Sequence, residues 1–202
     1  YQLNDFEQAL AAFVEQAEKH PQGSLLGDAL FMQGECHFRG EDHQQALTDY
    51  AAAVAQTLSS DAIKTLAHLH AGQSAGQLGK WKESLGWLER IATDQTDSPY
   101  LPQIQYEMAV AQQNLGNEAV ALQLFKKVVD RSRGEIKARA GFMMGELYYA
   151  KKEYLNAIRE FRKVMFGFDQ NADGKVRQWQ AKAGFEAGQC AGLVAAQEDK
   201  PT

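Results

Sequence analysis

The sequence predicts an all-α protein built from repeated pairs of antiparallel helices, and three observations lead to this fold class. A three-part pattern of small and large residues recurs at a fixed spacing. Turn signals fall where the helices of such a scheme must end, and apolar residues between them follow the 3,4 periodicity of an amphipathic helix. The 202 residues include only four prolines, a composition that also favours helix.

The recurring pattern is a small residue, a second small residue twelve positions later, and a large apolar residue four positions after that. We call the first helix of each pair helix A, the second helix B, and the small residue that opens the pattern the A-site residue. Small residues let two helices approach closely, and the large residue fills the space beside them. The four complete copies are Gly34–Ala46–Tyr50, Gly72–Ser84–Leu88, Ala109–Ala121–Phe125 and Gly145–Ala157–Phe161.

The turn signals give the expected bounds of each pair. Glycines at 40, 79 and 116 separate helix A from helix B, and segments such as His20-Pro21 and Ser98-Pro99 separate one pair from the next. Because a single pair cannot bury its own apolar face, we expect residues 1–202 to form one solenoid. Its predicted parts are a B-type helix over 1–20, full pairs over 25–58, 61–95, 100–132 and 135–168, and an A-type helix over 175–196.

These residues resemble the tetratricopeptide repeat (TPR) family over nearly the whole chain. The A-site residues and the helix-B small residues match the two small positions of that motif, and Pro21 matches its terminal proline. The chain departs from the family in its longer units, against about 34 residues, and in keeping the aromatic near the end of helix A only at Tyr148. The resemblance implies a right-handed superhelical α-solenoid that binds proteins and carries no catalytic residue. The half copies add Ala9 and Phe13 at the start and the A-site residue Gly188 at the end.

A narrower similarity concerns the bacterial cell envelope. Residues 7–13, 20–25, 31–38 and 142–149 are similar in style to envelope TPR proteins of the Tol-Pal accessory and outer-membrane-assembly lipoprotein type. The sequence begins at Tyr1 with no signal-like segment, so we interpret it as a piece of a longer chain. We therefore lean towards the periplasm or cell envelope, with the cytoplasm as the alternative.

The resemblance also indicates where a partner would bind. In this family the A helices line a concave groove, which here would have an apolar and aromatic floor with Gln and Glu contacts. Such a groove suits an extended peptide or an amphipathic helix. The alternative is that the row three residues before each A-site packs between repeats as core. The candidate groove residues are Phe31, Glu35, Phe38, Leu69, Gln73, Tyr106, Gln113, Phe142, Glu146, Tyr149 and Phe185.

Charge and hydropathy restrict the classes of partner that the chain is expected to bind. The net charge of −5 argues against nonspecific nucleic-acid binding. The charge is uneven, since residues 1–61 hold ten acids and two bases whereas residues 126–163 hold five acids and eleven bases. This asymmetry favours steering of a charged partner, or merely reflects solvated faces of different sign. No apolar run approaches the ~20 residues of a membrane-spanning helix, so we expect no direct membrane insertion by this segment.

Candidate chemistry is sparse. Cys36 and Cys190 occupy equivalent positions four repeats apart, so we expect them to be too far apart for a disulfide within one chain. Asp169, Asn171 and Asp173 fit the opening of a calcium loop, but Gln180 stands where such a loop needs its bidentate Glu. The alternative is a turn that caps the next helix. No catalytic or cofactor-binding motif is present.

The sequence therefore predicts a non-catalytic protein–protein interaction scaffold, without cofactor, that binds a peptide or helix in its concave groove. A role as a bacterial cell-envelope assembly factor is the finer hypothesis. The alternatives are a cytoplasmic TPR adaptor or regulator, or the TPR segment of a larger enzyme or secretion component. Homo-oligomerisation through the terminal helices is a further possibility, because uncapped solenoid ends leave apolar faces open.

Overall fold

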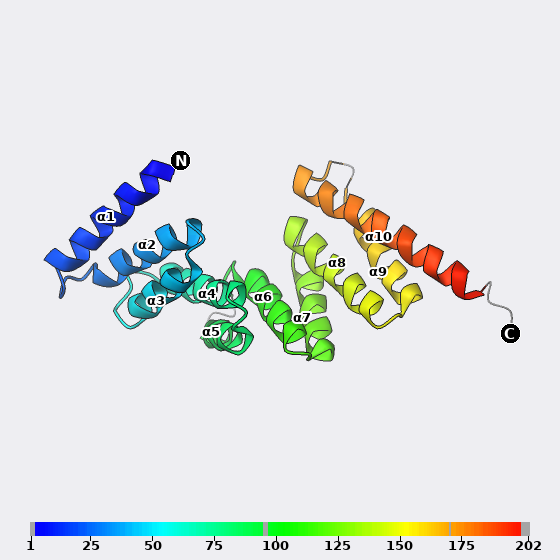
Figure 1. Ribbon diagram of the computed structural model, residues 1–202, viewed down its shortest axis with the longest axis horizontal. Coiled ribbons are helices and arrows are strands. Elements are labelled where there is room, and N and C mark those ends of the chain that lie inside the picture. Colours follow the sequence, from blue (N-terminus) through cyan, green and yellow to red (C-terminus); the bar gives the residue numbers. More distant parts are fainter. Residues whose placement is uncertain (1–2, 95–96, 170, 199–202) are drawn as a thin grey trace. The chain divides into compact units, whose positions relative to one another are not determined.

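The computed structural model describes residues 3–94, 97–169 and 171–198, and every regular element within these ranges is an α-helix (Figure 1). The predicted all-α fold class is thereby confirmed. The chain divides into two compact units, residues 1–115 and 116–202, which we describe separately. Whether they form one continuous solenoid stays a prediction. No helix in the described part is both long and apolar enough to cross a membrane.

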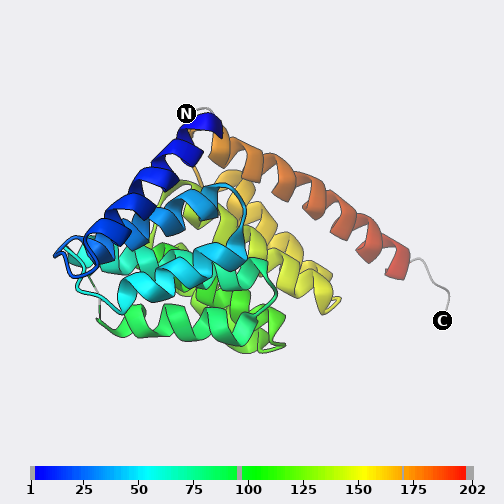
Figure 2. The ribbon, with the colours of Figure 1, turned by 60° about the vertical axis from the view of Figure 1, so that its left-hand side comes forward.

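The first unit contains six helices among its described residues. Figures 1 and 2 both show α1, α2 and α3 lying side by side, and α3 in turn contacts α4. These helices are joined by short turns and loops. They are α1 (Leu3–Lys19), α2 (Leu26–Arg39), α3 (His43–Val54), α4 (Asp61–Gln77), α5 (Trp81–Asp94) and α6 (Leu101–Asn114).

The second unit contains four helices among its described residues. Helix α9 contacts both α8 and α10, and α10 also contacts α8, so these three helices share one core. That core is built around Phe161 and Val164 of α9 with Ala183 and Cys190 of α10. The helices are α7 (Glu118–Arg131), α8 (Gly134–Ala150), α9 (Tyr154–Phe166) and α10 (Gly174–Glu198).

The A-site glycines touch the large helix-B residue of their own copy of the pattern. A Cβ added at Gly72 would lie 2.7 Å from Leu88 Cγ, and one at Gly145 would clash with the ring of Phe161. The helix-B small residue completes the contact, since the buried Ser84 hydroxyl donates a hydrogen bond of 2.6 Å to the Gly72 carbonyl. The residues that recur at this spacing in the sequence thus touch each other across the two helices of a pair.

Each turn between helix A and helix B places one residue in the left-handed conformation, always seven positions after the A-site residue. Glycine fills this position at Gly79 (φ 71°) and Gly116 (φ 80°), but Glu41 and Lys152 adopt it with φ 61° each. In the first turn the left-handed residue is therefore Glu41 and not Gly40, which has φ −80°. The turn geometry is set by the packing of the pair even where no glycine is available.

Candidate protein-interaction surface

The residues that stand three positions before each A-site lie mostly in the core. Phe31, Leu69 and Tyr106 are 6%, 3% and 5% exposed, so they offer almost no surface to a partner. Phe142 is half-buried, and its ring centroid lies 5.3 Å from that of Phe161. Phe185 differs from the rest, with 66% of its surface exposed on α10.

The residues four positions after each A-site lie in the last turns of helix A, where Phe38 and Tyr149 pack against the start of helix B. The ring centroids of Phe38 and His43 are 5.7 Å apart, and those of Tyr149 and Tyr154 are also 5.7 Å apart. The buried Oε1 of Gln113 has no hydrogen-bond partner. The side chains of Phe38, Gln113 and Tyr149 are half-buried, so part of each stays accessible.

The residues that stand one position after the A-sites at 34, 72 and 145 interact with residues on the next A helix. Glu35 Oε1 of α2 lies 2.5 Å from His70 Nδ1 of α4, and Gln73 Nε2 of α4 donates to Glu107 Oε1 of α6 at 2.8 Å. In the second unit the charge of Glu186 on α10 acts on Glu146 of α8. His70, Glu107 and Glu186 each stand two residues before an A-site. We call this row the A-helix ladder, defined by Glu35, His70, Gln73, Glu107, Glu146 and Glu186.

The sequence pointed to Glu35, Gln73 and Glu146 but missed their ladder partners. The signal that could have identified them is the constant spacing, because His70, Glu107 and Glu186 all hold the same position relative to Gly72, Ala109 and Gly188. A polar residue one after an A-site and another two before the next A-site predict such a pair.

The first-unit part of the ladder is firmly held. The Tyr50 hydroxyl donates to Glu35 at 2.7 Å, and the His70 ring stacks on Phe38 with centroids 5.0 Å apart and planes at 8°. Burial alone would raise the pKa of Glu35, but the contacts with His70 and Tyr50 and the charge of Arg39 outweigh it and hold that pKa below its ordinary value. Burial also raises the pKa of Tyr50, so its hydroxyl stays a donor.

The second-unit part of the ladder contains two acidic residues, Glu146 and Glu186. Burial raises the pKa of Glu146, and the neighbouring negative charge of Glu186 raises it further. An aromatic pair lies on the same two helices, since the ring centroids of Phe142 on α8 and Trp179 on α10 are 5.3 Å apart. Lys182 Nζ lies 4.4 Å from the centroid of the Trp179 ring. We call Phe142, Glu146, Trp179 and Glu186 the α8–α10 patch.

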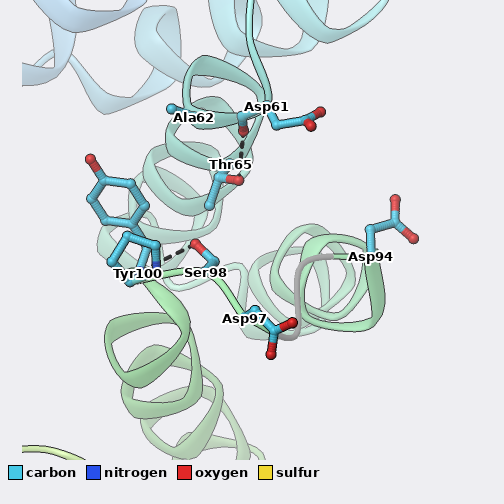
Figure 3. A pocket seen from close by; sticks show the side chains of 8 residues that line it. Asp61, Ala62, Thr65, Asp94, Asp97, Ser98 and Tyr100 are labelled. Carbon is cyan, nitrogen blue, oxygen red and sulfur yellow. Dashed lines mark hydrogen bonds between the residues drawn. The ribbon is translucent and has the colours of Figure 1, made fainter.

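A separate hollow lies between α4, α5 and the segment that precedes α6. It has a volume of about 450 Å³ and is bordered by Asp61, Asp94 and Asp97, whose carboxylates lie apart from one another in Figure 3. Asp94 is paired with Lys64 at 3.4 Å. Among the described residues, no group of three or more His, Cys, Asp or Glu side chains could hold a metal ion. The hollow therefore has no convergent set of ligands or catalytic groups.

The candidate calcium loop caps a helix. Asp173 Oδ1 accepts a hydrogen bond of 2.9 Å from the Val176 amide and so caps the start of α10. Gln180, at the twelfth position, donates its side-chain amide to the Met165 carbonyl at 2.9 Å. The loop residue Gln170 lies outside the described residues. The geometry of Asp173 and Gln180 accounts for this segment without a metal ion.

Both cysteines are buried thiols and neither is in a disulfide. Burial raises the pKa of Cys36 and of Cys190, which keeps them protonated and poorly nucleophilic at neutral pH. Among the described residues they therefore serve as small core side chains.

Comparison with known proteins agrees with the observed fold. Residues 1–62 and 103–132 each match a family model described as tetratricopeptide repeat. No curated protein matches the chain significantly. Solved structures with a similar fold include MamA (16% identity, 90% of this chain and 92% of that chain covered, TM-score 0.67). They also include pilF of Pseudomonas aeruginosa (18% identity, 96% and 83% covered, TM-score 0.65) and BtubC of P. vanneervenii (14% identity, 100% and 92% covered, TM-score 0.65).

Identities this low show the fold alone. The helical pairs, the A-site contacts and the two matched segments nevertheless agree with one another. Together they support a tetratricopeptide-type repeat fold, with family models matching residues 1–62 and 103–132.

Proposed function

We propose that the chain is a non-catalytic scaffold that binds a helix or extended peptide on its A helices, with the α8–α10 patch as the principal contact. The TPR fold is consistent with a protein-interaction scaffold, and proteins of this type are generally non-catalytic. The observation that carries the proposal is the half-buried aromatic pair Phe142 and Trp179, whose ring centroids lie 5.3 Å apart, on two helices that also carry Glu146 and Glu186.

The chemistry of the patch defines the partner. A cationic side chain placed between Glu146 and Glu186 would relieve their repulsion, and large apolar side chains would cover the half-buried rings of Phe142 and Trp179. We therefore expect a segment in which basic and large apolar residues share one face. Aromatic anchors beside charged contacts are typical of the residues that dominate binding energy.

A synthetic amphipathic peptide of Lys and Leu, followed by fluorescence anisotropy, tests this proposal. Phe142→Ala, Trp179→Ala and Glu146→Gln should each weaken its binding by roughly fivefold or more. Phe166→Ala is the matched control, because this phenylalanine is 70% exposed at the end of α9 and outside the patch. An analogue peptide with Glu in place of Lys should not bind. Equal affinity of all variants and both peptides would contradict the proposal.

Capture of natural partners provides the second test. A pull-down with the intact chain, repeated with Phe142→Ala and Tyr149→Ala, should lose partners in both variants, because Phe142 lies in the patch and Tyr149 follows it seven residues later on α8. Unchanged recovery in both variants would count against the groove.

The finer proposal of an envelope assembly role rests on the sequence resemblance to envelope TPR proteins. Fractionation of cells that express the full-length protein tests it. Recovery with periplasmic or envelope markers would support this role, and recovery with cytoplasmic markers would favour an adaptor or regulator.

A further inference from the structure

We propose that the outer face of α9 is a docking site for an acidic amphipathic helix of a partner protein. Exposed side chains of two kinds form this face, and the charge of its two arginines sets the chemistry of the partner. The face is separate from the α8–α10 patch, and the inference does not depend on peptide binding there. We call it the α9 stripe, defined by Leu155, Arg159, Arg162 and Phe166.

The α9 stripe follows the helical repeat along the whole of α9. Its residues are spaced four, three and four positions apart, which places them within about 60° of one another around the helix axis and over about 17 Å of its length. Leu155 is 67% exposed and Phe166 is 70% exposed, and both arginines between them are exposed as well. The stripe therefore presents a large apolar side chain at each end and two guanidinium groups in the middle.

The opposite face of α9 fixes the direction of the stripe. Ala157, Phe161 and Val164 are buried in the core that α9 shares with α8 and α10. At 3.6 residues per turn, these three residues lie on the side of the helix opposite to the stripe. The packing of α9 thus directs all four stripe residues away from the core.

The exposure of this face is a property of helix B and does not depend on the place of α9 in the chain. Every matching position of α7 is exposed, although α8 and α9 follow it, and the matching positions of α5 are exposed or half-buried. Those helices carry small or polar side chains there, so a solvated helix B has no need of Leu and Phe at these positions. The matching residues are Lys82, Gly86, Glu89 and Thr93 on α5, and Ala119, Gln123, Lys126 and Asp130 on α7.

The two arginines of the stripe are accessible to an acidic partner. Among the residues that the structure describes, neither Arg159 nor Arg162 takes part in an ion pair, whereas the neighbouring Lys163 lies 2.8 Å from Glu160. A guanidinium group binds a carboxylate through two parallel hydrogen bonds. The whole second unit favours the same kind of partner, since residues 116–202 hold 11 acids and 15 bases.

The shape of the stripe favours a helix over a flat anionic surface as the occupant. Its spacing is that of the seam between two packed helices, where each side chain fits between side chains of the other helix. A membrane surface engages a wide apolar face, whereas the stripe is flanked by the polar Asn156 and Lys163. We therefore expect a partner helix with a large apolar residue at each end of the contact and Asp or Glu between them.

A synthetic helical peptide that carries Leu, Glu, Glu and Leu at the spacing of the stripe tests the proposal by fluorescence anisotropy. Leu155→Ser, Phe166→Ser, Arg159→Gln and Arg162→Gln should each weaken its binding by roughly fivefold or more. The affinity should also fall as salt is added, because the exposed charges are screened. Circular dichroism checks that each variant stays helical. A wild-type chain that does not bind the peptide would overturn the proposal.

Two variants on α7 are matched controls. Lys126→Gln removes one exposed positive charge from the same unit, at the position that matches Arg162. Val120→Ser removes an apolar side chain that is 43% exposed. Both variants should bind the peptide as the wild type does. A loss in Lys126→Gln equal to that in Arg162→Gln would show that net charge alone drives binding, and would overturn the assignment to the stripe.

Three comparisons separate this site from other occupants and from the α8–α10 patch. A peptide of the same composition, with Leu and Glu on opposite faces, should bind roughly tenfold more weakly, and equal binding of both peptides would count against a helix seam. Cosedimentation with anionic lipid vesicles in place of peptide binding would overturn the proposal in favour of a membrane surface. Phe166→Ala should weaken binding of this acidic peptide and leave the Lys–Leu peptide bound, so failure at one site is distinguishable from failure at the other.

Discussion

Gly34 of α2 lies directly against the ring of Tyr50 on α3, because a Cβ at position 34 would come within 2.7 Å of Tyr50 Cε1. Tyr50 is fully buried and its hydroxyl is fixed by Glu35, so the ring cannot easily move away. The contact therefore explains why the sequence keeps a glycine inside a helix, where glycine is otherwise unfavourable.

Gly34→Ala is expected to lower the free energy of unfolding by about 1–3 kcal/mol, since the added methyl group overpacks a rigid contact. Gly86→Ala is the matched control within α5, where a Cβ would meet nothing within 4 Å. There the substitution should stabilise by about 0.5–1 kcal/mol through helix propensity. Urea denaturation measures both changes, and similar changes in both variants would show that the ring contact is unimportant.

Lys152→Gly is expected to raise the stability by up to about 1 kcal/mol, because a left-handed conformation is strained for a residue with a Cβ. Lys152 has φ 61° at the same position of its turn as Gly79, where φ is 71°. The reverse change, Gly79→Ala, should destabilise by a similar amount. Thermal unfolding of both variants checks the opposite signs, and a loss of stability in Lys152→Gly would contradict the assigned strain.

Glu35→Gln is expected to lower the free energy of unfolding by about 1–2 kcal/mol at neutral pH, through weaker hydrogen bonds with His70 and Tyr50. The pKa of Glu35 is held below its ordinary value of 4.5, so its charged form stabilises the folded state above pH 4.5. That stabilisation is lost as the pH falls from 4.5 through the lowered folded pKa. Unfolding measured between neutral and acidic pH should show the difference between wild type and variant shrinking in this range.

Glu146→Gln is expected to stabilise the protein at neutral pH by roughly 0.5 kcal/mol, the scale of a partly screened like-charge pair. The pKa of Glu146 is raised above 4.5, so its ionised form destabilises the folded state when the pH exceeds the folded pKa. Wild-type stability should therefore rise as the pH falls through that value, and the two proteins should converge below pH 4.5. Glu89→Gln, at an exposed position of α5, is the control and should show no such convergence.

Asp173→Ala is expected to destabilise the chain by about 1 kcal/mol, because α10 loses the side-chain cap on the Val176 amide. Millimolar calcium should leave the unfolding temperature of the wild type unchanged, since Gln180 is engaged with the Met165 carbonyl. A calcium-dependent rise that disappears in Asp173→Ala would instead establish an ion site.

The candidate surface could be predicted from the sequence only in part. The offsets from each A-site pointed to Glu35, Gln73 and Glu146, but counting along a helix does not tell an open side chain from one covered by the next repeat. Phe31 and Phe185 occupy equivalent positions, yet the first is 6% exposed and the second 66%. Phe31 packs in the core against Ala46 and Tyr50 of helix B of the same pair, a contact that counting along α2 alone could not reveal.

The sequence by itself determined the helices and their pairing, because helix periodicity, turn residues and the Gly34–Tyr50 type of spacing act over at most 16 residues. Only the tertiary structure decided which polar groups contact each other across repeats, such as Glu35 with His70 and Gln73 with Glu107. Those partners lie 35 and 34 residues apart and come together through the stacking of whole hairpins. The interaction energy between the two members of a pair depends on their burial and on the charges around them. Neither of these is determined by the helix in which a residue lies.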